Sequence, residues 1–305
     1  MTLLSIQNLS VAIHGTPILH DVSFDIAAGE IVAVTGESGS GKSMTAMSVM
    51  ALLLTGAKAT GRLTLDGRDI LSTDEATLCT MRGNEMGMVF QEPMTALNPV
   101  QTIGAQVAET IRIHERISKK QALIGASETL ERVGLPNDRF PLSRYPHELS
   151  GGQRQRVVIA MAIALRPKLL IADEPTTALD VTTQATILEL LKDLAAEFGM
   201  GLLMITHDLA VVSNIADRIV VMQNGQVVEQ GETQQLLSDM QHPYTKALFA
   251  ASAHQVDLPA PPAPAPLLSV KNVVRDYRMP RLGAFGKPQN FRAVDGVSFD
   301  LQRGD

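Results

Sequence analysis

A glycine-rich run that ends in lysine and serine is the first candidate for chemistry in this chain. The run Gly36-Glu37-Ser38-Gly39-Ser40-Gly41-Lys42-Ser43 fits the phosphate-binding spacing G-x-x-x-x-G-K-S, and Met44 follows it. Glycines let successive backbone N–H groups curl around a phosphate without a Cβ clash. Lys42 would reach the β- and γ-phosphates, and the Ser43 hydroxyl would bind Mg²⁺. The run therefore predicts a site for a nucleoside triphosphate with its magnesium ion.

Two acids and a histidine follow apolar runs further along the chain. Asp173 and Glu174 come directly after Leu169–Ala172, and His207 comes directly after Leu202–Thr206. We expect Asp173 to hold the Mg²⁺ shell through water and Glu174 to polarise the water that attacks the γ-phosphate. Without the glycine-rich run, the two acids could equally well form the solvated end of a strand. A lone histidine more often has a structural role.

Strands and helices that alternate would have to position these residues. Glu30–Thr35 is a short apolar run before the glycines, typical of a buried strand, and Gly41–Leu54 has the spacing of a helix. The unbroken apolar runs at 169–172 and 202–206 suit parallel strands that are covered on both faces. The pattern predicts an α/β fold, with the chemical side chains at the carboxyl ends of parallel strands.

A second glycine motif, Leu149-Ser150-Gly151-Gly152-Gln153, resembles the signature motif of ABC-type ATPases. Ser150 is a natural N-cap and Val157–Leu165 continues as a helix, so the motif also reads as a helix start suited to phosphate. The resemblance implies that Ser150, Gly151, Gly152 and Gln153 bind the γ-phosphate of ATP held by a partner domain. It also implies a P-loop NTPase fold of the ABC type, with a mostly parallel core sheet, an antiparallel β subdomain and a helical subdomain at about residues 93–165.

The same resemblance implies roles for other residues. Gln91 resembles the Q-loop glutamine that touches Mg²⁺ and the attacking water, Ala178-Leu179-Asp180 resembles the D-loop, and His207 resembles the switch histidine at the γ-phosphate. Ile13 stands where the family usually stacks adenine on an aromatic side chain. Isoleucine cannot give that offset stacking, so we expect weaker binding of the base here.

The chain contains an internal repeat on either side of a proline-rich segment. Leu3–Leu9 and Val22–Ile26 recur as Leu267–Val273 and Val297–Leu301, and Tyr277 matches Ile13. Five prolines between residues 258 and 266 favour an extended linker. We expect one nucleotide-binding domain at 1–257, a linker at 258–266, and the opening strands of a truncated second domain at 267–305; the alternative is an unrelated tail.

Composition narrows the classes of protein. The 305 residues carry a net charge of −6, which disfavours capture of nucleic acid, and Cys79 is the single cysteine. One cysteine excludes an internal disulfide and a four-cysteine iron–sulfur or zinc site. No apolar run approaches the roughly 18 residues of a membrane span, and no basic signal region opens the chain.

Two further segments indicate the subfamily. Gln91–Pro99 and Gln241–Leu248 resemble segments of the oligopeptide, dipeptide and nickel importer ATPases of bacteria, and the repeat resembles their fused tandem type, such as the glutathione and microcin C importers. This resemblance implies inner-membrane permease subunits as partners, a periplasmic or lipoprotein solute-binding protein indirectly, and a peripheral place on the cytoplasmic face of the inner membrane. The second ATPase domain would lie in the same chain or in a homodimer. The alternatives are a soluble ABC ATPase without transport, an exporter ATPase, and a nickel importer.

Overall fold

The computed structural model describes residues 2–90, 93–177, 179–252, 266–278 and 290–302. The chain divides into two compact units, Met1–Ala253 and His254–Asp305. Within the described residues, no helix is both long and apolar enough to cross a bilayer.

A six-stranded sheet forms the centre of the first unit. Its order is β10-β9-β3-β8-β7-β6, and every neighbouring pair is parallel except β10 with β9. The strands are β3 (Ile31–Thr35), β6 (Met86–Val89), β7 (Leu169–Asp173), β8 (Gly201–Ile205), β9 (Arg218–Gln223) and β10 (Gln226–Glu232). The predicted α/β class with a mostly parallel core sheet is confirmed.

Both faces of the central sheet are buried, which explains its unbroken apolar runs. Ala33 and Ala172 join the core with the helices, while Val34 and Ile171 join the core with a second, antiparallel sheet. That second sheet has the order β2-β1-β4-β5 and consists of β1 (Thr2–Ile13), β2 (Thr16–Ala27), β4 (Ala57–Leu65) and β5 (Arg68–Asp69). Because successive strand side chains point to opposite faces, one apolar run fills two cores.

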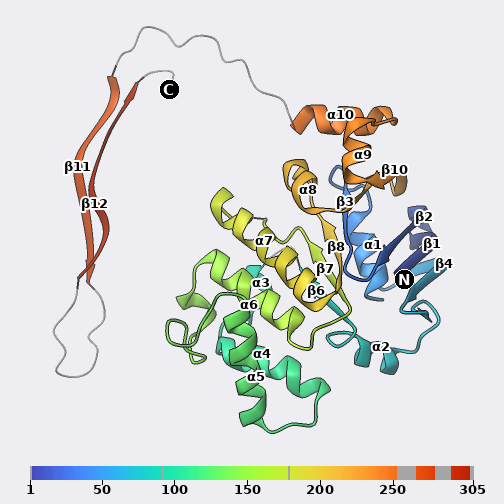
Figure 1. Ribbon diagram of the computed structural model, residues 1–305, viewed down its shortest axis with the longest axis horizontal. Coiled ribbons are helices and arrows are strands. Elements are labelled where there is room, and N and C mark those ends of the chain that lie inside the picture. Colours follow the sequence, from blue (N-terminus) through green and yellow to red (C-terminus); the bar gives the residue numbers. More distant parts are fainter. Residues whose placement is uncertain (1, 91–92, 178, 253–265, 279–289, 303–305) are drawn as a thin grey trace. The chain divides into compact units, whose positions relative to one another are not determined.

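Helices surround the sheets and form a separate cluster on one side (Figure 1). The cluster follows β6 and comprises α3 (Pro93–Ala96), α4 (Ile103–His114), α5 (Lys119–Arg132), the 3₁₀ turn η1 (Pro146–Glu148) and α6 (Gly151–Ile163). The remaining helices are α1 (Lys42–Val49), α2 (Glu75–Met81), α7 (Val181–Phe198), α8 (Leu209–Ile215), α9 (Thr233–Ser238) and α10 (Pro243–Ser252). Figure 1 shows the antiparallel sheet in blue and the helical cluster in green on opposite sides of the unit.

Helix α1 is shorter than the periodicity of residues 41–54 predicts. It ends at Val49, and Ala51 takes the left-handed conformation with φ 51°. Arg82 donates from Nε to the carbonyl oxygen of Met50 and from Nη2 to that of Ala51, both at 2.9 Å. A tertiary contact therefore ends the helix, and Leu54 is 60% exposed instead of continuing an apolar face.

The second unit contains an antiparallel hairpin of β11 (Pro266–Arg278) and β12 (Asn290–Gln302). It repeats a detail of the β1–β2 pair: Asn8 and Asn272 both have φ near 50°. Each of these asparagines donates its backbone N–H to a serine hydroxyl on the neighbouring strand at 2.8 Å, Ser23 in the first case and Ser298 in the second. The sequence repeat is thus also a repeat of local structure. The predicted linker at 258–266 lies outside the described residues apart from Pro266, and the proposed domain boundaries stay predictions.

Candidate functional site

The phosphate-type loop joins the carboxyl end of β3 to the start of α1, and two of its glycines are required by space. Gly36 has φ 148°, and a Cβ there would lie 2.1 Å from the carbonyl oxygen of Met222. Gly41 has φ 103° at the N-cap of α1, and a Cβ there would lie 2.6 Å from a methyl group of Leu19. These close approaches let the loop fold tightly between β9 and β2.

Lys42 turns back onto this loop. Its Nζ donates to the carbonyl oxygens of Gly36 at 2.7 Å and Glu37 at 2.8 Å. Burial lowers the pKa of the Lys42 ammonium, while the charges of Glu174 and Asp173 act in the opposite direction. The loop carbonyls thus hold a cation at the place where the motif predicts a phosphate group.

The loop meets the central strand β7 through one hydrogen bond. Ser43 Oγ donates to Asp173 Oδ1 at 3.1 Å. Asp173 is only 6% exposed, and this burial raises the pKa of its carboxyl, although the Ser43 hydrogen bond and Lys42 oppose the rise. A hydroxyl and a carboxylate at this distance are the hard oxygen donors that Mg²⁺ prefers. The two residues therefore fit the magnesium site that the sequence predicts.

Glu174 has an unusual backbone conformation beside this pair. Its φ is 45°, and its backbone N–H donates to the carbonyl oxygen of Ile205 at the end of β8 at 2.9 Å. The carboxylate accepts from Thr177 Oγ1 at 3.1 Å, and its other oxygen lies 3.4 Å from Nδ1 of His207. A left-handed conformation in a residue other than glycine is costly and is common at functional sites. Here the backbone of Glu174 joins the ends of β7 and β8, and its carboxylate lies next to Thr177 and His207.

The signature residues begin helix α6 next to the start of α7. Ser150 accepts from the N–H of Gln153 at 3.4 Å, and Gln153 Oε1 accepts from the N–H of Ser150 at 2.9 Å, which is a capping box. A Cβ on Gly152 would lie 2.4 Å from Cγ2 of Thr183, so glycine is also needed for helix packing. Asp180 caps α7, and its hydrogen bonds from Thr183 hold the pKa of its carboxyl below the usual value.

Five of the predicted residues thus meet at the carboxyl ends of β3, β7 and β8. They are Lys42, Ser43, Asp173, Glu174 and His207. The signature residues contact α7 instead, and Ile13 lies half-buried at the end of β1, paired with Thr16. Gln91 and Ala178, which were assigned to the Q-loop and the D-loop, lie outside the described residues. The remaining loop residues Ser38, Gly39 and Ser40 lie between β3 and α1, and Met44 lies in the first turn of α1.

Three contacts of this site were not predicted from the sequence. Thr177 donates to Glu174, the N–H of Gly225 donates to the carbonyl oxygen of Ser40 at 3.0 Å, and the N–H of Glu37 donates to Tyr244 Oη at 2.9 Å. Thr177 is three residues from Glu174 and could have been found as a short-range partner. The other two join the loop to residues about 200 positions away, and no local pattern reveals them.

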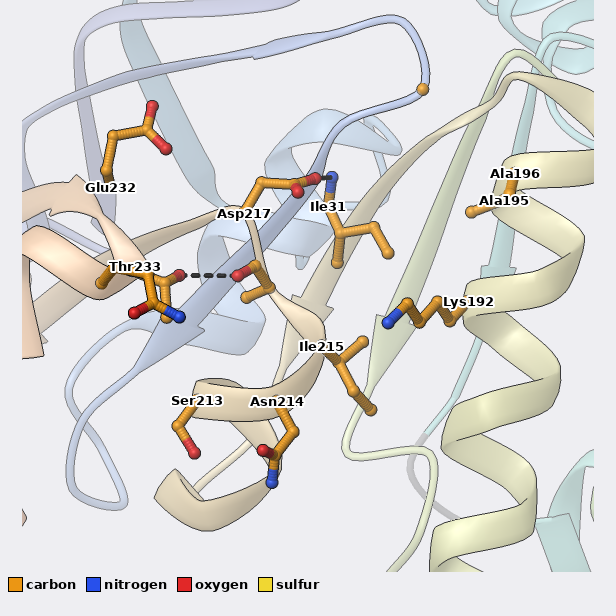
Figure 2. Close-up of a pocket in the computed structure, with 13 residues that line it drawn as sticks. Ile31, Lys192, Ala195, Ala196, Ser213, Asn214, Ile215, Asp217, Glu232 and Thr233 are labelled. Carbon is orange, nitrogen blue, oxygen red and sulfur yellow. Dashed lines mark hydrogen bonds between the residues drawn. The ribbon is translucent and has the colours of Figure 1, made fainter.

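Several hollows in the described part of the chain lie away from the phosphate-type loop, among them the following two. One, of about 490 Å³, opens at the amino ends of β3 and β9, the opposite edge of the sheet from the loop. Figure 2 shows Lys192 reaching toward it from α7, while Asp217 accepts from the N–H of Ile31 at 2.8 Å. The other, of about 390 Å³, is an apolar groove between α6, β6 and the end of α1, lined by Met50, Met86, Met88, Phe90 and Met161 among others.

The parallel sheet, the glycine-rich loop and the acids at the strand ends define a P-loop nucleotide-binding fold. The sequence profile of the ABC transporter family matches residues 19–177, and the chain belongs to that family. The solved dimer of the ATP-binding cassette MJ0796, bound to ADP and Pi, is 31% identical with a TM-score of 0.67. It covers 76% of this chain, and the match covers 99% of that one.

Curated relatives match almost the whole chain. The peptidoglycan transport ATP-binding protein YejF of Agrobacterium fabrum is 47% identical, and the glutathione import ATP-binding protein GsiA of Escherichia coli K12 is 42% identical. Each match covers 99% of this chain but only 56% and 54% of the relatives. The chain therefore spans just over half the length of these proteins.

Proposed function

We propose that this chain binds ATP and hydrolyses it as a nucleotide-binding domain of a membrane importer. The hydrogen bond between Ser43 Oγ and Asp173 Oδ1 carries this proposal, because it joins the phosphate-type loop to the acidic strand end. Lys42 would leave the loop carbonyls and hold the β- and γ-phosphates. The relative with ADP and Pi bound supports this choice of ligand.

Magnesium would be held by Ser43 and Asp173, with Gln91 as a further oxygen donor. The ion would neutralise charge on the phosphate oxygens. Glu174, which lies next to Asp173 in sequence and accepts from Thr177 Oγ1, would take a proton from the attacking water. His207, 3.4 Å from Glu174, would contact the γ-phosphate from the end of β8.

Each complete site would be shared by two domains. The signature residues Ser150–Gln153 open α6 beside α7, and their N–H groups at a helix start suit a phosphate held by another domain. The second domain would be the repeat in the same chain or a second copy of it. A homodimer of this chain would contain two complete sites.

Import of short peptides is the function that the relatives favour. Glutathione is a tripeptide and peptidoglycan carries short peptides, so the two relatives share peptide-bearing cargo. The methionine-rich groove would receive a helix of the membrane permease, since flexible methionines adapt to an apolar partner. The chain would then lie on the cytoplasmic face of the inner membrane, with the solute-binding protein acting on the permease.

The catalytic part of the proposal is tested with Glu174→Gln. This change removes the proton acceptor and keeps the side-chain size, so we expect phosphate release from Mg-ATP to fall by about a hundredfold or more. Binding of a fluorescent ATP analogue should stay within about twofold of wild type. Equal phosphate release by the variant and the wild type would refute the role of Glu174.

The transport part is tested by uptake in cells. Cells with the gene deleted would be restored with wild type or Glu174→Gln and given labelled glutathione, short peptides or nickel. Uptake of a peptide restored only by the wild type supports peptide import. Uptake of nickel alone would indicate that the transported substrate is the metal ion and not a peptide.

A further inference from the structure

The segment that follows β10 is fixed to the first unit at its start. Glu229 on β10 accepts from the N–H of Gln241 at 2.6 Å and from the N–H of His242 at 3.1 Å. His242 Nδ1 in turn accepts from the N–H of Tyr244 at 3.2 Å. These bonds satisfy backbone donors at the beginning of α10 and set the direction of that helix.

Tyr244 extends from this anchored helix to the phosphate-type loop. Its Oη accepts from the N–H of Glu37 at 2.9 Å, across 207 positions of sequence. The carbonyl oxygen of the same residue, Glu37, accepts from Lys42 Nζ. The N–H of Glu37 is thus bonded to Tyr244 and its carbonyl oxygen to Lys42. Of these two side chains, only Lys42 belongs to the loop.

The Lys42 bond and the Tyr244 bond to Glu37 are expected to respond differently to the binding of a phosphate group. Lys42 must exchange the carbonyl oxygens of Gly36 and Glu37 for phosphate oxygens. The Tyr244 hydroxyl is bonded to the backbone N–H of Glu37, which is not one of the carbonyl groups that Lys42 must release. We therefore expect this bond to remain when nucleotide binds and to keep the Glu37 backbone in place. A loop fixed in its bound shape loses less conformational freedom when it binds.

Helix α10 also packs against another helix of the first unit. It contacts α8, which begins two residues after His207, and Tyr244, Leu248 and Phe249 pack against the core that contains the helices. The anchor of Tyr244 is therefore a rigid part of the unit and not a free chain end.

We infer that Tyr244 is a positioning residue that fixes the Glu37 backbone of the phosphate-type loop and thereby raises the affinity for nucleotide. The inference rests on the proposed nucleotide site. It predicts an effect on binding without an effect on the chemical step, because the Tyr244 hydroxyl contacts the Glu37 backbone, whereas the proposed chemical step is assigned to Glu174.

The test compares Tyr244→Phe with wild type in the full 305-residue chain. We expect the Kd for MANT-ADP to rise about three- to tenfold, because the ordering of the Glu37 backbone would then be left to the binding step. The KM for ATP should rise by the same factor while kcat stays within about twofold. Lys246→Gln, on an exposed position of the same helix, is the matched control and should behave like wild type.

A second variant shows whether Tyr244 acts through its anchor. Glu229→Gln weakens the acceptor for Gln241 and His242 and should also raise the Kd. In the double variant with Tyr244→Phe the two effects should not add, since both act on one contact. Additive effects, an unchanged Kd in Tyr244→Phe, or a fall in kcat without a change in KM would each overturn the inference. Failure of the wild type itself to bind MANT-ADP would refute the nucleotide site instead.

Discussion

Single residues at the site combine a buried charge with the ability to bind a metal. Asp173 is almost fully buried, and its carboxylate has one hydrogen bond from Ser43 and a neighbouring cation, Lys42. Burial raises the pKa of Asp173 in the absence of metal, which means that the charged form is costly until a cation arrives. Asp173 therefore favours the binding of a cation and lowers the stability of the folded protein when no cation is bound.

The change Asp173→Asn tests this cost. When folding raises the pKa of a carboxyl, the folded protein loses stability as the pH rises above the ordinary pKa of about 4. The total loss is about 1.4 kcal/mol for each unit by which folding raises that pKa. We expect the variant to melt at a higher temperature than wild type at neutral pH without nucleotide. The difference should shrink as the pH falls toward about 4, where both side chains are neutral.

Magnesium supplies the complementary measurement on the same variant. Mg-ADP should raise the melting temperature of wild type more than that of Asp173→Asn, because the amide is a weaker ligand. Equal melting temperatures for the two proteins at neutral pH, with and without Mg-ADP, would contradict the account of this residue.

A second prediction for a single residue concerns Ile13 and the binding of adenine. Ile13→Tyr should tighten binding of adenine nucleotides about two- to tenfold, the worth of one aromatic stack of about 0.5–1.5 kcal/mol. Binding of inorganic pyrophosphate, which has no base, should not change. Calorimetry with ADP and with pyrophosphate makes the comparison, and an unchanged affinity for ADP would count against the adenine position.

At the scale of elements, the sequence was a good guide to strands and a poorer one to where α1 ends. The runs at 30–35, 169–172 and 202–206 predicted β3, β7 and β8 because burial on both faces leaves a continuous apolar pattern. The pattern of 41–54 continued past Val49, yet the helix stops there because Arg82 binds the carbonyl groups of Met50 and Ala51. Contacts across 31 or 32 positions leave no local signal.

The same distinction applies to the site. That Lys42, Ser43, Asp173 and Glu174 lie close together could be predicted, because each stands at the end of a strand or the start of a helix in a recognisable spacing; their roles stay predictions. The contacts of Tyr244 and Gly225 with the loop depend on how distant elements pack. Their residue types carry no signal of that contact.

The end of α1 gives a prediction at this scale. Arg82→Ala should lower the free energy of unfolding by about 1–3 kcal/mol, because two carbonyl groups lose a charged donor and Glu75 loses its ion pair. Arg68→Ala is the matched control, since Arg68 is half-exposed and pairs with Glu85 at the surface, where such pairs contribute about 0–1 kcal/mol. Urea denaturation measures both. Equal losses in the two variants would mean that the helix end does not depend on Arg82.

For the whole molecule, the two copies of the β1–β2 pattern are the main finding. The hairpin of β11 and β12 reproduces the left-handed asparagine and its serine partner, so the repeat extends beyond apolar periodicity. Tyr277 in this hairpin stands where the first copy has Ile13. The two copies are therefore alike in backbone and different at the position assigned to the base.

The position of the signature residues has a consequence for activity. The first unit holds one phosphate-type loop, and its signature residues contact α7 within the same unit. If hydrolysis needs a loop from one domain and a signature from another, we expect the 305-residue chain to hydrolyse ATP when two copies meet. Activity would then depend on sites that two domains share.

The rate of phosphate release per molecule, measured over a hundredfold range of protein concentration with saturating Mg-ATP, tests whether two copies share each site. We expect the rate per molecule to rise with concentration and to level off as dimers form, and Glu174→Gln should stay inactive throughout. A rate per molecule that is the same at every concentration down to the most dilute sample would contradict it.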